Sequence, residues 1–184
     1  FMAQRIGKPA RAIDKLDPVW TRIREEAEDI VRREPEVGTF IFSSILHHDT
    51  LETAVVNRVA ERLDHQDVSA ELIRQAYADA LEDEPTLGDT FRVDIVATYD
   101  RDPATDRFIE PVLYFKGFHA IVTHRLAHWL HGRGRKDLAL YLQSRSSSVF
   151  QTDINPASRI GKGIFLDHAT GLVVGSTAVI GDNV

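Results

Sequence analysis

The chain has 184 residues, of which 43% are hydrophobic and 27% charged, as is usual for a globular protein. Its formal net charge is −6 and no block of basic residues stands out, so we expect no nucleic acid as a partner. Cysteine is absent, which excludes disulfides and thiolate metal sites. No apolar run reaches the roughly 18 residues of a membrane span, so we expect a cytoplasmic protein without a membrane partner.

From Asp17 to about His131 the pattern is that of a helical domain, while the basic and polar residues 1–16 are expected to form a disordered arm. A first helix is predicted to begin at Asp17, which suits the N-cap, with Pro18 at the first helical position. Further helices are predicted in the segments VGTFIFSSILHH, TLETAVVNRVAERLD and SAELIRQAYADALEDE, and from Thr86 to about Asp100.

The segment YDRDPATDRFIEP interrupts this pattern with Pro103, Pro111 and clustered aspartates, and is predicted to be a loop rich in carboxylates. A long helix is predicted in VLYFKGFHAIVTHRLAHWLHGRG, followed by a last helix in KDLALYLQSRSSSVF. In the long helix His124, His128 and His131 share one face, a spacing at which histidines can bind zinc. Because no further ligand is evident nearby, we interpret them as residues packed around Trp129 and expect no metal site.

At Asp153 the period of the sequence changes. Ile154, Ile160 and Leu166 lie six residues apart, and Val174 and Ile180 are again six apart after a two-residue slip. Such a hexapeptide repeat is typical of a parallel β-helix, in which three units make one coil. The sequence therefore predicts an α+β fold. An all-helical domain at residues 17–149 precedes the first coils of a β-helix at residues 150–184. Since fewer than two coils and no cap are present, we expect a fragment of a longer protein.

Three segments together resemble the serine acetyltransferase family: RDPATD at 101–106, LYFKGFHAIVTHRLAHWLHGRGRK at 113–136, and FQTDINPASRIGKGIFLDHATGLVVGSTAVIGDNV at 150–184. The repeat alone is a weak signal, because many acyltransferases share it, whereas the combination is specific. The resemblance implies a left-handed β-helix and transfer of an acetyl group from acetyl-coenzyme A to the hydroxyl of L-serine. The product, O-acetylserine, feeds L-cysteine synthesis.

The resemblance also implies the roles of individual residues. His168 is the general base, Asp153 is its acidic partner, and Asp102 and Asp167 hold the ammonium group of serine. Acetyl-coenzyme A is a co-substrate, no cofactor is permanently bound, and the residues that bind coenzyme A are expected beyond Val184.

The family's partners are implied in the same way. L-Cysteine is the expected feedback inhibitor, and the expected assembly is a trimer or a dimer of trimers. O-Acetylserine sulfhydrylase is expected to bind only through a C-terminal tail that this chain lacks.

The chemistry explains why these residue types are suitable. A serine hydroxyl is a poor nucleophile, and a histidine has a pKa suited to removing its proton. Asp167 and His168 occupy the second and third positions of the unit that begins at Leu166, where side chains can point outward. Asp153 precedes His168 by 15 residues, a little under one coil, so a contact between them is feasible.

Structural interpretations of the same residues remain open. Asp167 can be a polar corner residue, His168 a surface histidine, Asp153 a turn residue, and Asp102 a cap for its loop. Two alternative functions also remain. The chain can be a non-catalytic fragment that serves assembly and the serine site, or another hexapeptide acyltransferase that acts on a sugar.

Overall fold

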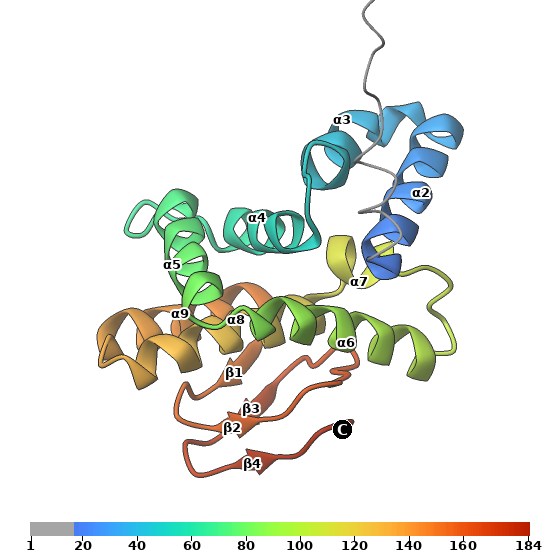
Figure 1. The fold of residues 1–184 in the computed structure, drawn as a ribbon. Coiled ribbons are helices and arrows are strands. Elements are labelled where there is room, and N and C mark those ends of the chain that lie inside the picture. The colour runs from blue at the N-terminus through green and yellow to red at the C-terminus, as the bar shows by residue number, and fades with distance from the viewer. Residues whose placement is uncertain (1–16) are drawn as a thin grey trace, which may run out of the picture.

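The structure is a computed structural model that describes residues 17–184, so the predicted disordered arm at residues 1–16 lies outside the described residues. Helices precede strands along the described chain (Figure 1). The helical elements are α2 (Pro18–Arg33), η1 (Pro35–Val37), α3 (Gly38–Ile41), η2 (Phe42–Leu46), α4 (Leu51–Leu63), α5 (Ala70–Asp83), α6 (Thr86–Arg101), α7 (Ile109–Tyr114), α8 (Lys116–Gly132) and α9 (Lys136–Phe150). The strands are β1 (Thr152–Ile154), β2 (Arg159–Ile160), β3 (Leu172–Val174) and β4 (Val179–Ile180).

The predicted start of the first helix is confirmed. Asp17 is the N-cap of α2, and its carboxylate accepts a hydrogen bond from the Trp20 amide at 3.1 Å, while Pro18 follows at the first helical position. This cap satisfies one of the backbone N–H groups that a helix start leaves without a partner. Arg92 of α6 also binds Asp17, together with Glu52 of α4, so the start of α2 is tied to two other helices.

Two predicted helices differ from the observed elements. The segment VGTFIFSSILHH does not form one α-helix, because the short helix α3 passes directly into the π-helix η2. The long helix predicted from Val112 to His131 is broken at Phe115, which has an extended backbone with φ −88° and ψ 112°.

Side chains from other helices make the break at Phe115 possible. The carbonyl groups at the end of α7 lack partners within the helix. Arg58 of α4 donates to the Leu113 carbonyl at 2.9 and 3.1 Å, and the His119 ring of α8 bonds to the Val112 carbonyl at 2.7 Å. Helical periodicity predicted neither contact, since both depend on how the helices pack.

The strands pair in parallel, β1 with β3 and β2 with β4, and lie below α6, α8 and α9 in the view of Figure 1. The register joins Ile154 to Val174 and Ile160 to Ile180, the same residues that the hexapeptide repeat aligns. Ile154 and Val174 are buried, whereas the neighbouring Val173 is 72% exposed, so each strand has one inner and one outer side.

A buried ion pair joins the strand segment, by which we mean residues 151–184, to the helices. Asp94 of α6 accepts hydrogen bonds from Arg125 of α8 at 2.7 and 2.9 Å and from the Ile164 amide at 2.9 Å. Arg125 also donates to the Gly161 carbonyl at 3.0 Å. Ile164 itself belongs to the same hydrophobic core as the helices. The helices and the first strands are therefore packed as one unit.

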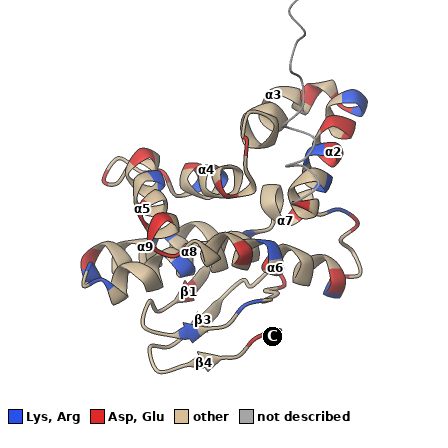
Figure 2. Cartoon of the chain, in the orientation of Figure 1, with Lys and Arg blue, Asp and Glu red and all other residues tan. Residues whose placement is uncertain are grey.

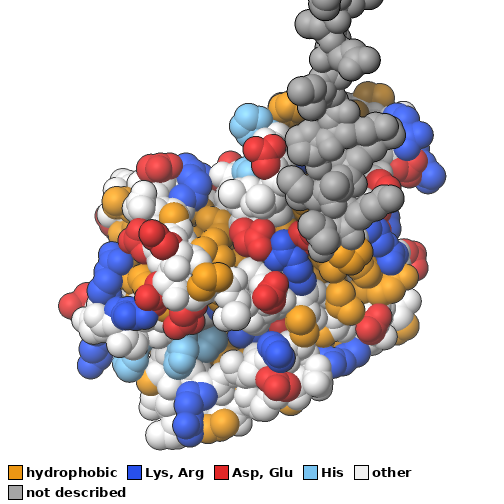
Figure 3. Space-filling view, in the orientation of Figure 1, with side chains coloured by type: hydrophobic (Ala, Val, Ile, Leu, Met, Phe, Trp, Pro, Cys, Tyr) orange, Lys and Arg blue, Asp and Glu red, His pale blue; other side chains and the backbone are white. Residues whose placement is uncertain are grey.

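Among residues 17–184 the charged residues do not gather in one place (Figure 2). Figure 2 shows acidic and basic residues spread along the helices, and Figure 3 shows them interspersed on the face in view. No helix among residues 17–184 is both long enough and apolar enough to cross a membrane.

Candidate functional site

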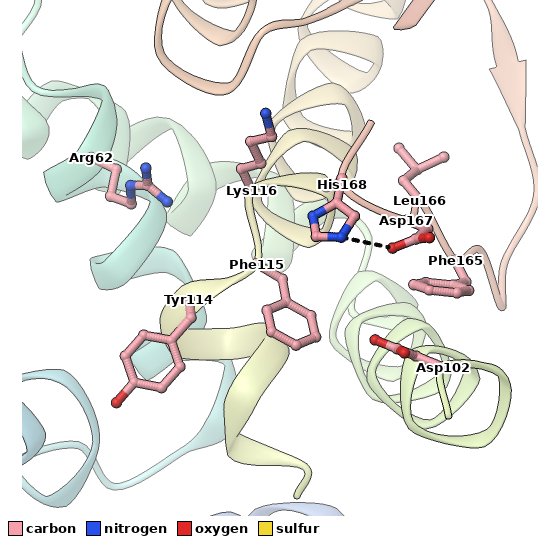
Figure 4. Close-up of a pocket in the computed structure, with 10 residues that line it drawn as sticks. Arg62, Asp102, Tyr114, Phe115, Lys116, Phe165, Leu166, Asp167 and His168 are labelled. Carbon is pink, nitrogen blue, oxygen red and sulfur yellow. Dashed lines mark ion pairs between the residues drawn. The ribbon is translucent and has the colours of Figure 1, made fainter. Parts of the chain in front are cut away.

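A cavity of about 400 Å³ lies between the start of α8 and the loop that follows β2 (Figure 4). Parts of the chain that are far apart in sequence contribute to it: α4, the end of α6, the junction of α7 with α8, and residues 165–168. The residues that line the cavity are Arg62, Asp102, Tyr114, Phe115, Lys116, Gly117, Phe165, Leu166, Asp167 and His168. Its volume lies in the range of small-molecule sites, roughly 300–1,000 Å³.

Asp102 is the C-cap of α6 and lies on the cavity wall. One oxygen of its carboxylate accepts a hydrogen bond from the Thr105 hydroxyl at 2.6 Å, and the other accepts one from the Ala104 amide at 2.9 Å. These two bonds lower the pKa of Asp102, the Thr105 bond most, and the nearby His168 lowers it further. The carboxylate caps its own loop, as the structural interpretation held, and it is also kept ionised in the cavity.

Asp167 and His168 lie at a corner of the strand segment, which we call the 167–171 corner after its residues. Their side chains are 69% and 88% exposed, and His168 Nε2 lies 3.7 Å from Asp167 Oδ1. His168 and Ala169 have φ values of +48° and +58°, a left-handed conformation that is uncommon for residues other than glycine. The corner therefore presents an imidazole and a carboxylate to the cavity, as their positions in the repeat predicted.

Asp153 lies apart from the other three candidates. It belongs to β1, and its Oδ1 accepts a hydrogen bond from Gln143 of α9 at 2.7 Å. Asp153 does not line the cavity. Among the described contacts, the carboxylate that lies beside the His168 ring belongs to Asp167. The structure thus brings together Asp102, Asp167 and His168, and does not bring Asp153 to them.

Two cations of the cavity wall were not among the predicted site residues. Arg62 projects from α4, where its guanidinium bonds to the buried His119 ring at 2.9 Å and lies over the Phe150 ring. Lys116 begins α8 and lies between Arg62 and His168 in Figure 4. The KGFHA motif, which contains Lys116 and His119, was the sequence signal from which Lys116 could have been identified. Arg62 is distant in sequence, and only the packing of α4 against α8 reveals its place.

The histidines that share a face of α8 lie outside this cavity. His124 is buried, and burial lowers its pKa to about 3. Its ring centre lies 5.7 Å from that of His128, whose Nδ1 bonds to the Pro156 carbonyl at 2.8 Å. The Trp129 side chain, around which these histidines were expected to pack, donates a hydrogen bond to Asp83. Among residues 17–184, no group of three His, Asp or Glu side chains is placed to hold a metal ion.

Comparison with known proteins gives consistent matches. Residues 19–123 match the family model described as serine acetyltransferase, N-terminal. The chain is 42% identical over 171 residues to a serine acetyltransferase of Escherichia coli, an alignment that covers 93% of this chain and 63% of that relative. The chain thus spans less than two thirds of this relative's length.

Solved structures give the same result. A crystal structure of serine acetyltransferase from Brucella abortus in complex with coenzyme A is 60% identical, with a TM-score of 0.89, and the match covers 92% of this chain and 68% of that one. A serine acetyltransferase in complex with cysteine is 42% identical, with a TM-score of 0.88, and covers 90% of this chain and 64% of that one.

Proposed function

The chain belongs to the serine acetyltransferase family, and we propose that the protein transfers an acetyl group from acetyl-coenzyme A to the hydroxyl of L-serine. The product would be O-acetylserine, a precursor of L-cysteine. The observation that carries the proposal is the cavity in which Asp102, Asp167 and His168 meet. The cavity wall also includes the guanidinium of Arg62, so it offers charges of both signs, as a zwitterionic amino acid requires.

We propose that Asp102 and Asp167 bind the ammonium group of serine. The hydrogen bonds from Ala104 and Thr105 support this role, because they hold the Asp102 carboxylate in place on the cavity wall. Asp167 adjoins His168 in the chain, so an ammonium held by Asp167 lies near the imidazole. In serine the ammonium and the hydroxyl are on neighbouring carbon atoms. Binding of the ammonium at Asp167 therefore brings the hydroxyl within reach of His168.

His168 then acts as the general base. Its imidazole takes the hydroxyl proton while the serine oxygen attacks the carbonyl carbon of the thioester. The carbon–sulfur bond breaks, and the proton on His168 passes to the departing coenzyme A thiolate. The new ester bond replaces the thioester, and His168 returns to its neutral form. Direct transfer of this kind needs no acyl-enzyme, and the chain has no cysteine to form one.

Asp153 is proposed as the acidic partner that stabilises the imidazolium. Gln143 occupies its Oδ1, which leaves Oδ2 available to accept from an imidazole N–H. The His168 side chain is 88% exposed, so little packing holds the imidazole at Asp167. A carboxylate bonded to one ring nitrogen fixes which nitrogen of the imidazole can act as base, as in the Ser-His-Asp triad.

The remaining features of the assembly belong to the same proposal. The paired strands are the first coils of a left-handed β-helix, whose later coils complete the binding of coenzyme A. Val173 and Val179 are 72% and 63% exposed on the outer side of the strands, which supports burial of that side in a trimer or a dimer of trimers. L-Cysteine, found bound in a related structure, is proposed as an inhibitor at the serine site. We place the protein in the cytoplasm, where acetyl-coenzyme A is available.

The test is steady-state kinetics of the full-length protein that contains this chain. The variant His168→Ala is expected to lower kcat/KM for serine by on the order of 10²–10⁴-fold, the usual contribution of a positioned base. His47→Ala, which removes an exposed histidine of the helical region, serves as the control and retains activity. Near-normal turnover by His168→Ala contradicts the assignment of the base.

The same assay separates the alternatives. Acetylation of an amino sugar in place of serine identifies a different acyltransferase. Because this chain spans 63% of the E. coli relative, a non-catalytic role for the chain alone is the second candidate. Calorimetry of residues 1–184 with L-serine, L-cysteine and acetyl-coenzyme A distinguishes it. Binding of the amino acids without coenzyme A indicates a serine-site fragment, whereas binding of both substrates with turnover indicates an enzyme.

A further inference from the structure

Lys116 occupies a position where a helix disfavours a cation. It is the first residue of α8, and the N-terminal end of a helix carries a partial positive charge. Local helix electrostatics therefore do not explain a lysine here, whereas a contact outside the helix does. That contact is with the strand segment, because the Lys116 ammonium donates to the Gln151 side-chain oxygen at 2.9 Å and to the Thr170 hydroxyl.

The 167–171 corner needs such support. His168 and Ala169 hold positive φ values, and backbone of this kind persists only when its surroundings fix it. The side chains of Asp167 and His168 do little to fix it, because both extend into solvent. The corner is held instead through backbone atoms: the Gly171 amide donates to the Gln151 carbonyl at 2.8 Å, and the Thr152 hydroxyl donates to the Ala169 carbonyl at 3.2 Å.

The contacts from Gln151 and Thr152 come from the end of α9 and the first residue of β1, so they connect the corner to the chain that begins the strand segment. The contact from Lys116 is different, because it connects the corner to a helix whose next residue, Gly117, lies against the backbone of Leu166. Leu166 directly precedes Asp167. The start of α8 therefore contacts the chain on both sides of the Asp167–His168 pair, at Leu166 and at Thr170.

We propose that Lys116 is a positioning residue: through Thr170 and Gln151 it holds the 167–171 corner so that Asp167 and His168 face Asp102 across the cavity. Its effect on catalysis rests on the function proposed above, whereas its effect on the corner does not. A misplacement of about 1 Å can cost on the order of 10²-fold in rate, so even a small movement of the corner is measurable.

Two pairs of variants of the full-length protein test the contact. Lys116→Met keeps the apolar stem and removes the donors, while Lys116→Arg keeps a cation that can reach both oxygens. Thr170→Val removes the hydroxyl at nearly constant shape, while Thr170→Ser keeps it. The control is Lys136→Met, which removes an exposed lysine from the same first position of α9.

In the kinetic measurement, Lys116→Met and Thr170→Val are each expected to lower kcat by about tenfold, with a smaller change in the KM for serine. The double variant is expected to lose no more than the poorer single variant, because both changes break one contact. Lys116→Arg, Thr170→Ser and Lys136→Met are expected to stay within about threefold of the unaltered protein.

Amide hydrogen exchange of residues 166–172 provides a readout that does not depend on activity. Faster exchange in Lys116→Met and Thr170→Val, and not in Lys136→Met, is the expected result. Unchanged exchange, unchanged kcat, or losses that multiply in the double variant overturn the inference. If Lys116→Met does not fold, the Thr170 pair decides. A failure of the unaltered protein to acetylate serine contradicts the proposed function alone, since the exchange result still stands.

Discussion

His119 is buried beside the cavity, and its two neighbours determine which ring nitrogen carries the proton. The Val112 carbonyl can only accept, so Nε2 donates to it at 2.7 Å, and the Arg62 guanidinium can only donate, so Nδ1 accepts from it at 2.9 Å. Burial is the main cause that lowers the pKa of His119 to about 3. The neutral ring therefore links Arg62 of the cavity wall to the end of α7.

This burial predicts a pH dependence of stability. In the unfolded chain His119 binds a proton below its usual pKa of 6.5, whereas the folded protein binds it only near pH 3. The unfolded state thus holds more protons between these values. The free energy of unfolding should then fall as the pH drops below 6.5, by up to about 1.4 kcal/mol per pH unit for this histidine. Above pH 6.5 the contribution is complete.

The variant His119→Gln, which cannot titrate, should show a shallower dependence in urea unfolding between pH 4.5 and 7. Part of the slope should remain, because His124 is buried with a similarly lowered pKa. Replacement of the exposed His47 by Gln is the control and should leave the slope as it is. Equal slopes in all three proteins would show that His119 does not carry the effect.

At the scale of elements, α8 matters most for the site, because its first turn lies against the strand segment. A Cβ atom added to Gly117 would lie 3.0 Å from the Leu166 carbonyl carbon and 3.1 Å from its Cβ, with the carbonyl oxygen closer still. Such distances are too short for a side chain, and the opposing atoms are mostly backbone. Glycine at this position lets the helix and the corner approach each other.

Gly117→Ala should therefore destabilise the protein by about 1–3 kcal/mol, the usual cost of overpacking, and should displace the backbone next to Asp167. Thermal unfolding measures the first effect and the kcat for serine acetylation the second. Gly132→Ala on the last turn of the same helix is the matched control. Its Cβ would meet nothing within 4 Å, so stability should be unchanged or slightly higher. Similar melting temperatures for the two variants would refute the close approach.

The elements also show what the sequence can and cannot predict. Local signals were sufficient for α2, where Asp17 and Pro18 set the start, and for α9, whose ends match the predicted segment. They were insufficient at Phe115, because Arg58 and His119 make the break possible from other parts of the fold.

The site divides in the same way. Motif resemblance named Asp102, Asp167 and His168, which the fold brings to one cavity, and Asp153, which lies outside that cavity and is bonded to Gln143. Arg62 depends on the packing of α4, and no local pattern indicates it. The contact of Lys116 with Thr170 likewise joins residues that only the folded chain brings together.

For the whole molecule, the decisive contact is the buried pair of Asp94 and Arg125, whose side chains are 0% and 8% exposed. Desolvation raises the pKa of Asp94, and Arg125 opposes this rise. Because both groups also bond to the backbone of the strand segment, the pair fixes where that segment sits on the helices. A buried pair of this kind is costly to break on one side.

Asp94→Asn should destabilise the protein by about 3–5 kcal/mol, since it leaves the Arg125 charge without a partner. The double change Asp94→Leu with Arg125→Leu should cost less than the two single changes added together, because it leaves no unpaired charge. Asp29→Asn, which breaks a more exposed ion pair with Arg33, is the control and should cost less than about 1 kcal/mol. Urea unfolding measures the free energy of unfolding of each variant. An Asp94→Asn protein that is as stable as Asp29→Asn would contradict the importance of the buried pair.

The strand register has a consequence for finding and redesigning such sites. Partners in the parallel pairs are 20 residues apart, as Thr152 and Leu172 show, although three hexapeptide units would place them about 18 apart. The two additional residues fall between Leu166 and Val174, the interval that contains Asp167 and His168. In this sequence the change of phase in the hexapeptide repeat therefore marks the corner that carries Asp167 and His168. For a designer, the same interval is where new functional groups can be introduced while the stacking positions keep their register.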